Sequence, residues 1–308
     1  MSVYQTLLGI LSELENEGKL RPEEYELCEK YSLSRLTSFK TGGEATVLFP
    51  KTVSAAALIY PLLKENSIPT FILGNGSNVI AKDEGYSGLI LSLIGLKKTE
   101  VKGEVITAEC GALLTSVATL AQKNALTGME ALYGIPGTVG GAVFMNAGAY
   151  GSECRDVIVS ATFVTAKGEV KTYPVEELAM GYRTSRFEES DDLILSADFA
   201  LKAGDGASIR AAMDDFMSRR LEKQPLEYPS AGSTFKRYEG RFTAQLIDES
   251  GLKGYRSGGA MVSEKHAGFV INFDHATSAD IFAVIQKVQD TIYEREGIRI
   301  QREVRIIE

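Results

Sequence analysis

The stretch GIPGTVGGAVFMNAGAYG, residues 134–151, constrains the fold of this chain more than any other feature of its sequence. It holds six glycines in eighteen residues, one proline and no charged side chain. A glycine inside regular structure is roughly 0.5–1 kcal/mol less favourable than an alanine, so this density of glycine has to be compensated. The sequence therefore predicts that something bulky lies against the main chain of this stretch, where side chains would be in the way.

A second glycine-rich loop, GNGSN at residues 74–78, follows a short apolar strand predicted at residues 70–73. Small polar residues after a strand let successive backbone N–H groups converge on an anion. A dinucleotide fingerprint needs a third glycine at position 79 and a helix after it, but the residue is Val79 and the pattern that follows is strand and turn. This mismatch excludes a Rossmann fold. Two such loops indicate either one large ligand contacted by backbone or a pair of tight turns in a crowded sheet.

Helical and strand patterns alternate irregularly, which favours an α+β fold over a doubly wound sheet. Periodicity predicts helices at residues 1–18, 22–30, 52–66, 113–124, 208–224, 244–249 and 277–296, with Pro61 expected to kink or end the third. Strands are predicted at residues 45–50, 70–73, 89–94, 104–110, 156–166, 192–201, 234–237, 267–272 and 298–307. At 308 residues the chain suggests two domains, and a change in composition places their boundary near residue 203.

The net charge of −8 argues against sequence-independent nucleic-acid binding, which needs a basic surface. Any anionic ligand must therefore be met by local clusters of lysine and arginine. The three cysteines, Cys28, Cys110 and Cys154, are widely separated, which indicates neither a disulfide framework nor a zinc site. We expect a cytoplasmic protein in a reducing compartment, with no metal and no membrane partner, because the longest apolar run, residues 55–63, is too short to span a bilayer.

Six blocks occur in an order typical of one bacterial enzyme family: GNGSN, GMEALYGIPGTVGGAVFMNAGAYG, GYRTSRF, PSAGSTFKR, EKHAGFVIN and EVRII. By these blocks the chain resembles the UDP-N-acetylenolpyruvoylglucosamine reductases, also called UDP-N-acetylmuramate dehydrogenases, over nearly all of its length beyond residue 30. The spacing of the blocks is similar to that of the shorter of the family's two subtypes. An ordered set of six blocks is far more specific than any one of them.

The resemblance implies a two-part FAD-binding region of the vanillyl-alcohol-oxidase (PCMH) type at residues 1–203, with lobes divided near residue 95, and an α+β substrate-binding domain at residues 204–308. It implies that NADPH reduces FAD and that the flavin reduces the enolpyruvyl group of the substrate, giving UDP-N-acetylmuramate for peptidoglycan synthesis. Both histidines, His266 and His275, fall in the second domain, so attachment of flavin through a histidine of the first is excluded. We expect a dissociable FAD and a monomer.

The resemblance also assigns site residues. Ser233 is the implied proton donor, Arg183 the implied partner of the substrate carboxylate and of the enolate charge, and Glu303 the implied active-site glutamate. The implied cofactor contacts are Gly74, Asn75, Gly76, Ser77, Asn78, Gly137, Thr138, Gly140, Gly141, Asn146 and Gly148. The implied substrate contacts are Tyr182, Lys223, Lys236, Arg237 and His266.

Two positions depart from the family pattern, since Tyr238 stands where a proline is expected and Glu308 where a glycine is expected. On residue pattern alone, Ser233 is a turn hydroxyl, Arg183 a surface ion-pair partner and Glu303 part of a solvated strand face. Two alternatives to the reductase therefore stay open: another FAD-dependent oxidoreductase of the same fold, and a silent nucleotide-sugar-binding module. The job of Glu303 and the preference for NADPH over NADH are not decided by the sequence.

Overall fold

The computed structural model describes residues 2–238 and 241–308, which form two compact units. The first unit holds the described residues up to Glu29, together with Thr46–Asn75 and Gly88–Ser218. The second holds Lys30–Ala45, Gly76–Ser87 and the described part of Arg219–Glu308. Among the described residues, no helix is both long enough and apolar enough to cross a bilayer. The boundary near residue 203, predicted from a change in composition, stays a prediction.

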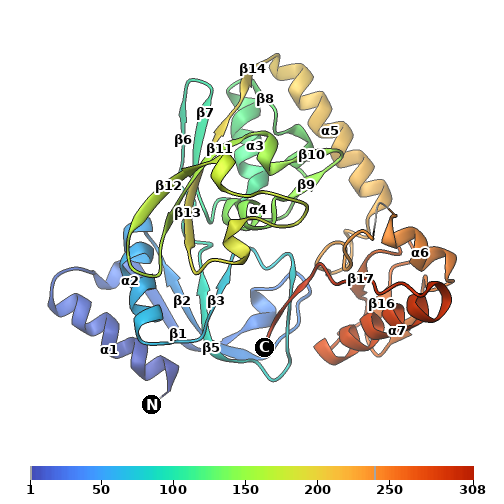
Figure 1. Ribbon diagram of the computed structural model, residues 1–308, viewed down its shortest axis with the longest axis horizontal. Helices are drawn as coiled ribbons and strands as arrows, with labels where there is room; N and C mark the ends of the chain where they lie inside the picture. Colours follow the sequence, from blue (N-terminus) through green and yellow to red (C-terminus); the bar gives the residue numbers. More distant parts are fainter. Residues whose placement is uncertain (1, 239–240) are drawn as a thin grey trace. The chain divides into compact units, whose positions relative to one another are not determined.

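Two sheets contribute to the first unit (Figure 1). The larger is antiparallel throughout, with the strand order β12–β11–β13–β7–β6. Its strands are β6 Thr99–Lys102, β7 Val105–Glu109, β11 Ile158–Val164, β12 Val170–Pro174 and β13 Leu193–Ala200. The other has the order β1–β2–β5–β3, with β1 Tyr25–Ser32, β2 Glu44–Pro50, β3 Thr70–Leu73 and β5 Tyr86–Ser92. Strands β3 and β5 run parallel, with Thr70 opposite Leu89.

One hydrophobic core serves the first unit. Leu7, Ile59, Leu114 and Phe163 are completely buried in it, so helices and sheet strands share the same apolar interior. The helices are α1 Val3–Asn16, α2 Val53–Glu65, α3 Leu114–Lys123, α4 Val139–Met145 and α5 Gly206–Lys223. Short strand pairs add β8 Leu126–Thr127 with β14 Lys202–Ala203, and β9 Gly148–Ala149 with β10 Ser152–Glu153.

One sequence-based assignment in the first unit is wrong, and one of two expected outcomes at Pro61 does not occur. The predicted helix at residues 22–30 is a 3-10 turn, Pro22–Glu24, followed by strand β1. Tyr25 and Leu27 both pack against the core, a spacing of two that suits a strand and not a helix. Helix α2 does not end early at Pro61 but continues to Glu65, because its apolar face stays anchored in the core on both sides of the proline.

The second unit packs helix α7 Ser278–Glu296 against the three-stranded sheet β15–β16–β17 (Figure 1). The strands are β15 Arg256–Ser257, β16 Ala260–Val262 and β17 Val270–Asn272, and a shorter helix, α6, covers Thr243–Glu249. Helix α7 confirms the predicted bounds, since Thr277 caps its start and Gly297 ends it at φ 69°. The predicted long terminal strand is shorter, with β18 Arg305–Ile307 pairing in parallel with β4 Val79–Ala81.

Backbone crowding explains glycine at position 76 of the GNGSN loop. Gly76 has φ +62°, and a Cβ added to it would collide with the carbonyl oxygen of Leu36. The loop is fixed there by Ser38, whose backbone N–H donates to the Gly76 carbonyl oxygen at 3.0 Å and whose hydroxyl donates to the Ser230 carbonyl oxygen at 2.6 Å. A side chain at position 76 would therefore force these backbone segments apart.

We expect Gly76→Ala to lower the free energy of unfolding by more than about 2 kcal/mol. The left-handed conformation accounts for about 1–2 kcal/mol, and the collision with Leu36 adds about 1–3 kcal/mol. Gly103→Ala is the matched control, because Gly103 has φ +61° but open space around its added Cβ. Urea denaturation followed by circular dichroism should show the smaller loss for the control; equal losses would contradict the crowding explanation.

Candidate functional site

The predicted site residues are divided between the two units. The first unit contains Gly74, Asn75, Gly137, Thr138, Gly140, Gly141, Asn146, Gly148, Tyr182 and Arg183. The second contains Gly76, Ser77, Asn78, Lys223, Ser233, Lys236, Arg237, His266 and Glu303.

Ser233 and Glu303 lie on neighbouring backbone segments of the second unit. The Glu303 N–H donates to the carbonyl oxygen of Thr234 at 2.9 Å, and Phe235 pairs with Arg302 in an antiparallel bridge. Thr234 is 2% exposed, and its hydroxyl accepts a hydrogen bond from the Val270 N–H at 3.1 Å. The exposed Ser233 therefore stands beside a buried, hydrogen-bonded anchor that also holds the backbone of Glu303.

Asn78, at the end of the GNGSN loop, holds the other edge of the Glu303 segment. Its side-chain Nδ2 donates to the Glu303 carbonyl oxygen at 3.2 Å, and its own carbonyl oxygen accepts from the Arg305 N–H at 3.1 Å. These bonds precede the parallel pairing of β4 with β18. The backbone of Glu303 is thus hydrogen-bonded on two sides, which restricts its position.

The predicted cations of the second unit surround the Ser233 segment along the chain. The Lys236 N–H donates to the Gln301 carbonyl oxygen at 2.9 Å, so this residue belongs to the same paired backbone. The Arg237 guanidinium lies 4.7 Å from the centre of the Phe242 ring, and Lys223 is exposed in the last turn of α5. Lys223, Lys236 and Arg237 flank Ser233 along the chain, and an acidic protein needs such local positive residues to meet an anion.

His266 has a backbone partner within the second unit. Its Nδ1 accepts from the Gly268 N–H at 3.1 Å, and its ring meets Phe269 edge-to-face at 4.8 Å. Burial lowers the pKa of His266 below its ordinary value of 6.5, so the neutral imidazole is favoured. The Gly268 carbonyl oxygen in turn accepts from the Thr234 N–H at 2.8 Å, which connects the histidine turn to the serine segment. Its contact with substrate stays a prediction.

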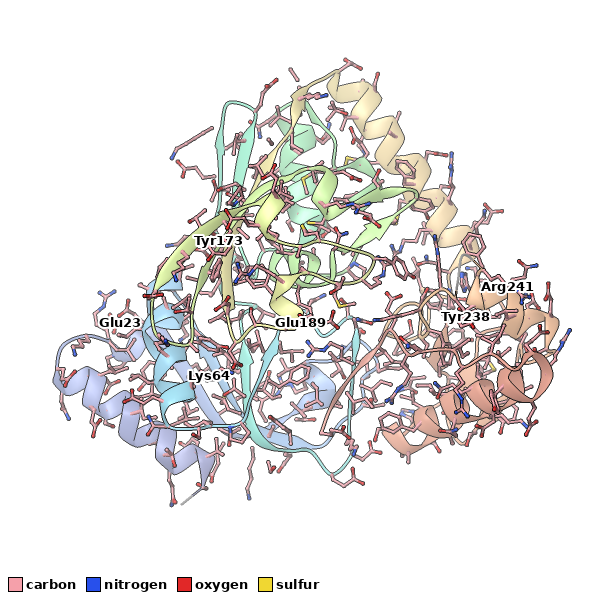
Figure 2. All side chains as sticks on the ribbon, viewed as in Figure 1. Glu23, Lys64, Tyr173, Glu189, Tyr238 and Arg241 are labelled. Atoms are coloured by element: carbon pink, nitrogen blue, oxygen red, sulfur yellow. The ribbon has the colours of Figure 1, made fainter. Side chains whose placement is uncertain are left out.

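The two departures from the family pattern have local explanations. Tyr238 and Arg241, both labelled in Figure 2, pair in an antiparallel bridge. The Tyr238 N–H donates to the Arg241 carbonyl oxygen at 3.3 Å. A proline has no N–H and could not make this bond. Glu308 forms an ion pair with Lys82 at 2.6 Å, and this partner lowers the pKa of the glutamate. A cavity of ≈ 630 Å³ lies beside this terminal segment, lined by Gln289, Arg299, Ile300, Gln301, Arg302, Val304, Arg305, Ile306 and Glu308.

The two glycine-rich loops meet in the first unit. The Asn75 side-chain Nδ2 donates to the Pro136 carbonyl oxygen at 2.6 Å, and a Cβ on Gly74 would collide with the Thr138 hydroxyl. Thr138 is 2% exposed and caps helix α4. The sequence predicted no helix within residues 134–151, because its glycines disfavour one.

The glycines of α4 have different reasons to be glycine. Gly140 packs on Cys110, where an added Cβ would lie 3.0 Å from the cysteine Cβ, and its N–H donates to the Cys110 carbonyl oxygen at 2.7 Å. Gly141 is exposed, and a Cβ there would meet only the Thr138 hydroxyl at an ordinary 3.5 Å. A side chain at position 140 would be packed tightly against Cys110, which accounts for the glycine there. Position 141 has room for a Cβ, so close approach of a ligand is left as the reason for its glycine.

Arg183 occupies a strained turn in the first unit. Its φ is +57°, and the turn is closed by bonds between Gly181 and Thr184 at 3.0 and 3.4 Å. The guanidinium lies 5.3 Å from the centre of the Tyr182 ring, and its Nη2 donates to the Gly148 carbonyl oxygen at 3.4 Å. A non-glycine residue in the left-handed region is uncommon and clusters at functional sites.

The buried thiols of the first unit are poor candidates for covalent attachment of a cofactor. Cys110 and Cys154 are 1% and 0% exposed, and burial raises the pKa of each thiol to about 12. The thiolate, which is the reactive form, is therefore scarce at neutral pH. Cys28 is partly exposed, and burial followed by Glu26 raises its pKa as well.

Sequence reasoning missed the anchors around the predicted residues. Thr234, which holds the Glu303 backbone, carries no motif of its own and is visible only once Val270 and Glu303 are placed beside it. Ser185, 3% exposed, was passed over although it adjoins the Arg183 turn. Thr234 and Ser185 are small polar residues close in sequence to a predicted catalytic residue. That feature of the sequence could have indicated both.

The chain is similar to known proteins over its whole length. The family described as "UDP-N-acetylenolpyruvoylglucosamine reductase, C-terminal domain" matches residues 224–307, and the one described as "FAD binding domain" matches residues 45–173. The UDP-N-acetylenolpyruvoylglucosamine reductase of Lactiplantibacillus plantarum is 46% identical over 283 residues, covering 92% of this chain and 94% of the relative. That of Exiguobacterium sibiricum is 44% identical over 308 residues, covering 100% and 99%.

A solved structure agrees with these relatives. The crystal structure of UDP-N-acetylenolpyruvylglucosamine reductase from Thermus caldophilus superposes with a TM-score of 0.81 at 30% identity, covering 92% of this chain and 100% of that one. The predicted α+β fold class, an FAD-binding region followed by a C-terminal domain, is thereby confirmed. On the identity and coverage of these relatives, the chain belongs to the UDP-N-acetylenolpyruvoylglucosamine reductase family.

Proposed function

We propose that this protein reduces the enolpyruvyl group of UDP-N-acetylenolpyruvoylglucosamine to give UDP-N-acetylmuramate, with NADPH as reductant and Arg183, Ser233 and Glu303 as the catalytic residues. The observation that carries the proposal is the paired backbone in which Thr234, the residue after Ser233, accepts from the Glu303 N–H at 2.9 Å within a chain of this family. The reaction serves peptidoglycan precursor synthesis. A monomeric state and a cytoplasmic location stay predictions.

The residues present fit an FAD. The two glycine-rich loops approach each other at Gly74 and Thr138, and Gly141 offers exposed backbone whose lack of a side chain packing does not explain. These loops carry no charged side chain, so N–H groups and hydroxyls would hold the nucleotide. The residues proposed to hold it are Gly74, Asn75, Gly76, Ser77, Asn78, Gly137, Thr138, Gly140, Gly141, Gly148 and Asn146, the last through its backbone alone because its side-chain amide is bonded within the protein. When bound, FAD supplies hydride transfer from NADPH to the vinyl carbon of the substrate.

Ser233 is the proposed proton donor. Addition of hydride at the terminal vinyl carbon moves the double-bond electrons onto the neighbouring carbon, next to the carboxylate. The Ser233 Oγ–H bond then breaks, the proton goes to that carbon, and the hydroxyl recovers a proton from solvent. A serine is a weak acid, so the nearby cations Lys223 and Lys236 are proposed to stabilise its alkoxide.

Arg183 and Glu303 act on the negative charge of the substrate carboxylate and of the enolate that develops beside it. A guanidinium can give two parallel hydrogen bonds to a carboxylate, and these strengthen as enolate charge grows in the transition state. Glu303 polarises the substrate carboxylate when it is protonated, or orients a water, from a backbone held by Thr234 and Asn78. The substrate's pyrophosphate is met by Lys223, Lys236 and Arg237, while the 43%-exposed Tyr182 offers a ring for the uracil or sugar and His266 a further contact.

Ser233→Ala should separate the two halves of the catalytic cycle. Anaerobic stopped-flow absorbance of the flavin should show reduction by NADPH at the normal rate and reoxidation by substrate slowed at least about 100-fold, the typical contribution of a general acid. Ser257→Ala, a serine of β15 in the same unit, is the matched control and should leave both rates unchanged. Equal slowing of both half-reactions by Ser233→Ala would instead indicate a structural role for the serine.

The alternatives are distinguished by one steady-state assay. The purified protein should be yellow, and its oxidation of NADPH should depend on added UDP-N-acetylenolpyruvoylglucosamine. A yellow protein that oxidises NADPH without regard to this substrate would be another FAD-dependent oxidoreductase. A colourless protein that binds the substrate without turnover would be a nucleotide-sugar-binding module.

A further inference from the structure

We propose that Asn146 is a positioning residue that fixes the turn carrying Arg183, and so sets the direction of the catalytic guanidinium. The functional meaning of the inference rests on the role proposed above for Arg183. Asn146 is 0% exposed and ends helix α4 in the left-handed conformation, with φ 42° and ψ 58°. A completely buried amide at a helix end must have internal partners, and these show what it does.

The Asn146 amide joins three segments of the first unit. Its Nδ2 donates to the Gly181 carbonyl oxygen at 2.9 Å and to Glu153 Oε2 at 2.9 Å. Its Oδ1 accepts from the Arg155 N–H at 3.0 Å. Both N–H groups and the oxygen are therefore used inside the protein, and such a satisfied buried network specifies one arrangement of its members.

The same part of the chain makes two further contacts with the Arg183 turn. The Ser185 hydroxyl donates to the Phe144 carbonyl oxygen at 2.9 Å, two residues before Asn146. Arg183 Nη2 donates to the Gly148 carbonyl oxygen at 3.4 Å, two residues after Asn146. Residues 144–148 thus hold the turn at its start, at its end and at the guanidinium itself.

The turn needs such support because Arg183 is strained. A non-glycine residue at φ +57° is sterically disfavoured and persists only where its surroundings enforce it. Catalytic groups must be held closely, since a displacement of about 1 Å can cost about 100-fold in rate. Asn146 provides the enforcing bond to Gly181, the residue at which the turn begins.

Two requirements explain why residue 146 is an asparagine: a left-handed backbone and two side-chain hydrogen-bond donors. Asparagine tolerates the left-handed conformation and offers two amide hydrogens. Glycine has the conformation without the amide, and aspartate has similar volume but no N–H to give to Gly181 or Glu153. The asparagine within the glycine-rich stretch therefore serves the arginine turn, and its side chain has no hydrogen left to give a flavin.

Asn146→Gly tests the inference, because it keeps the backbone conformation and removes only the amide. In the flavin-loaded enzyme we expect reduction by NADPH to stay within about threefold, while reoxidation by substrate slows about 10- to 100-fold. The matched control is Ala125→Gly, another left-handed residue of the first unit (φ 53°), just after helix α3, whose side chain no site needs. It should leave both rates unchanged. Equal slowing of both half-reactions by Asn146→Gly would overturn the inference.

A double-mutant cycle with Arg183→Ala shows whether the asparagine acts through the arginine. If it does, adding Asn146→Gly to Arg183→Ala should slow reoxidation less than twofold further. Multiplication of the two effects would overturn the inference. Should Asn146→Gly not fold, Asn146→Asp removes the same donors at nearly constant volume and should give the same pattern.

A structural readout separates failure of this inference from failure of the proposed function. Amide hydrogen exchange of residues 181–185 should be faster in Asn146→Gly than in the unaltered protein, and unchanged in Ala125→Gly. Faster exchange with no effect of Arg183→Ala on reoxidation would refute the role of Arg183 but not the positioning of its turn. Unchanged exchange would refute the positioning.

Discussion

The second unit's share of the site depends on the two-sided hydrogen bonding of the chain around Glu303. One edge is held by Thr234, whose carbonyl oxygen accepts from the Glu303 N–H, and the other by Asn78, whose amide donates to the Glu303 carbonyl oxygen. The segment is thus held on one edge by a backbone bond and on the other by the Asn78 side chain. Both bonds are made to the backbone of Glu303, so they order the segment without fixing which side chain residue 303 carries.

In the first unit, glycines let backbone segments approach their neighbours closely. Gly74 leaves no room for a Cβ beside Thr138, and a Cβ at Gly140 would be tightly packed against Cys110, so packing bears on both glycines whatever ligand is bound. Packing does not explain Gly141. Contact of a nucleotide with the backbone at Gly141 stays a prediction.

The sequence predicted the elements whose signals are local and missed those decided by tertiary contact. The ends of helix α7 were predicted to within a residue because a capping threonine or serine and a terminal glycine mark them. Strand β1 was mistaken for a helix, since only the core against Tyr25 and Leu27 shows its period of two. Helix α4 was missed because propensity opposes it, and packing against Cys110 overrides propensity.

The site shows the same division. Ordered motifs and the family resemblance were enough to propose Ser233, Glu303 and Arg183 as catalytic residues, and that assignment stays a prediction. The resemblance implied a cofactor contact for Asn146 but not its bond to Gly181, which lies 35 positions further along the chain.

The central claim is that hydride enters the terminal vinyl carbon and an exchangeable hydroxyl protonates the carbon next to the carboxylate. A single turnover in deuterium oxide, followed by NMR of the product, tests it most directly. Because the Ser233 hydroxyl exchanges with solvent, the account predicts deuterium on the carbon that bears the carboxylate. Protium at that carbon would contradict it.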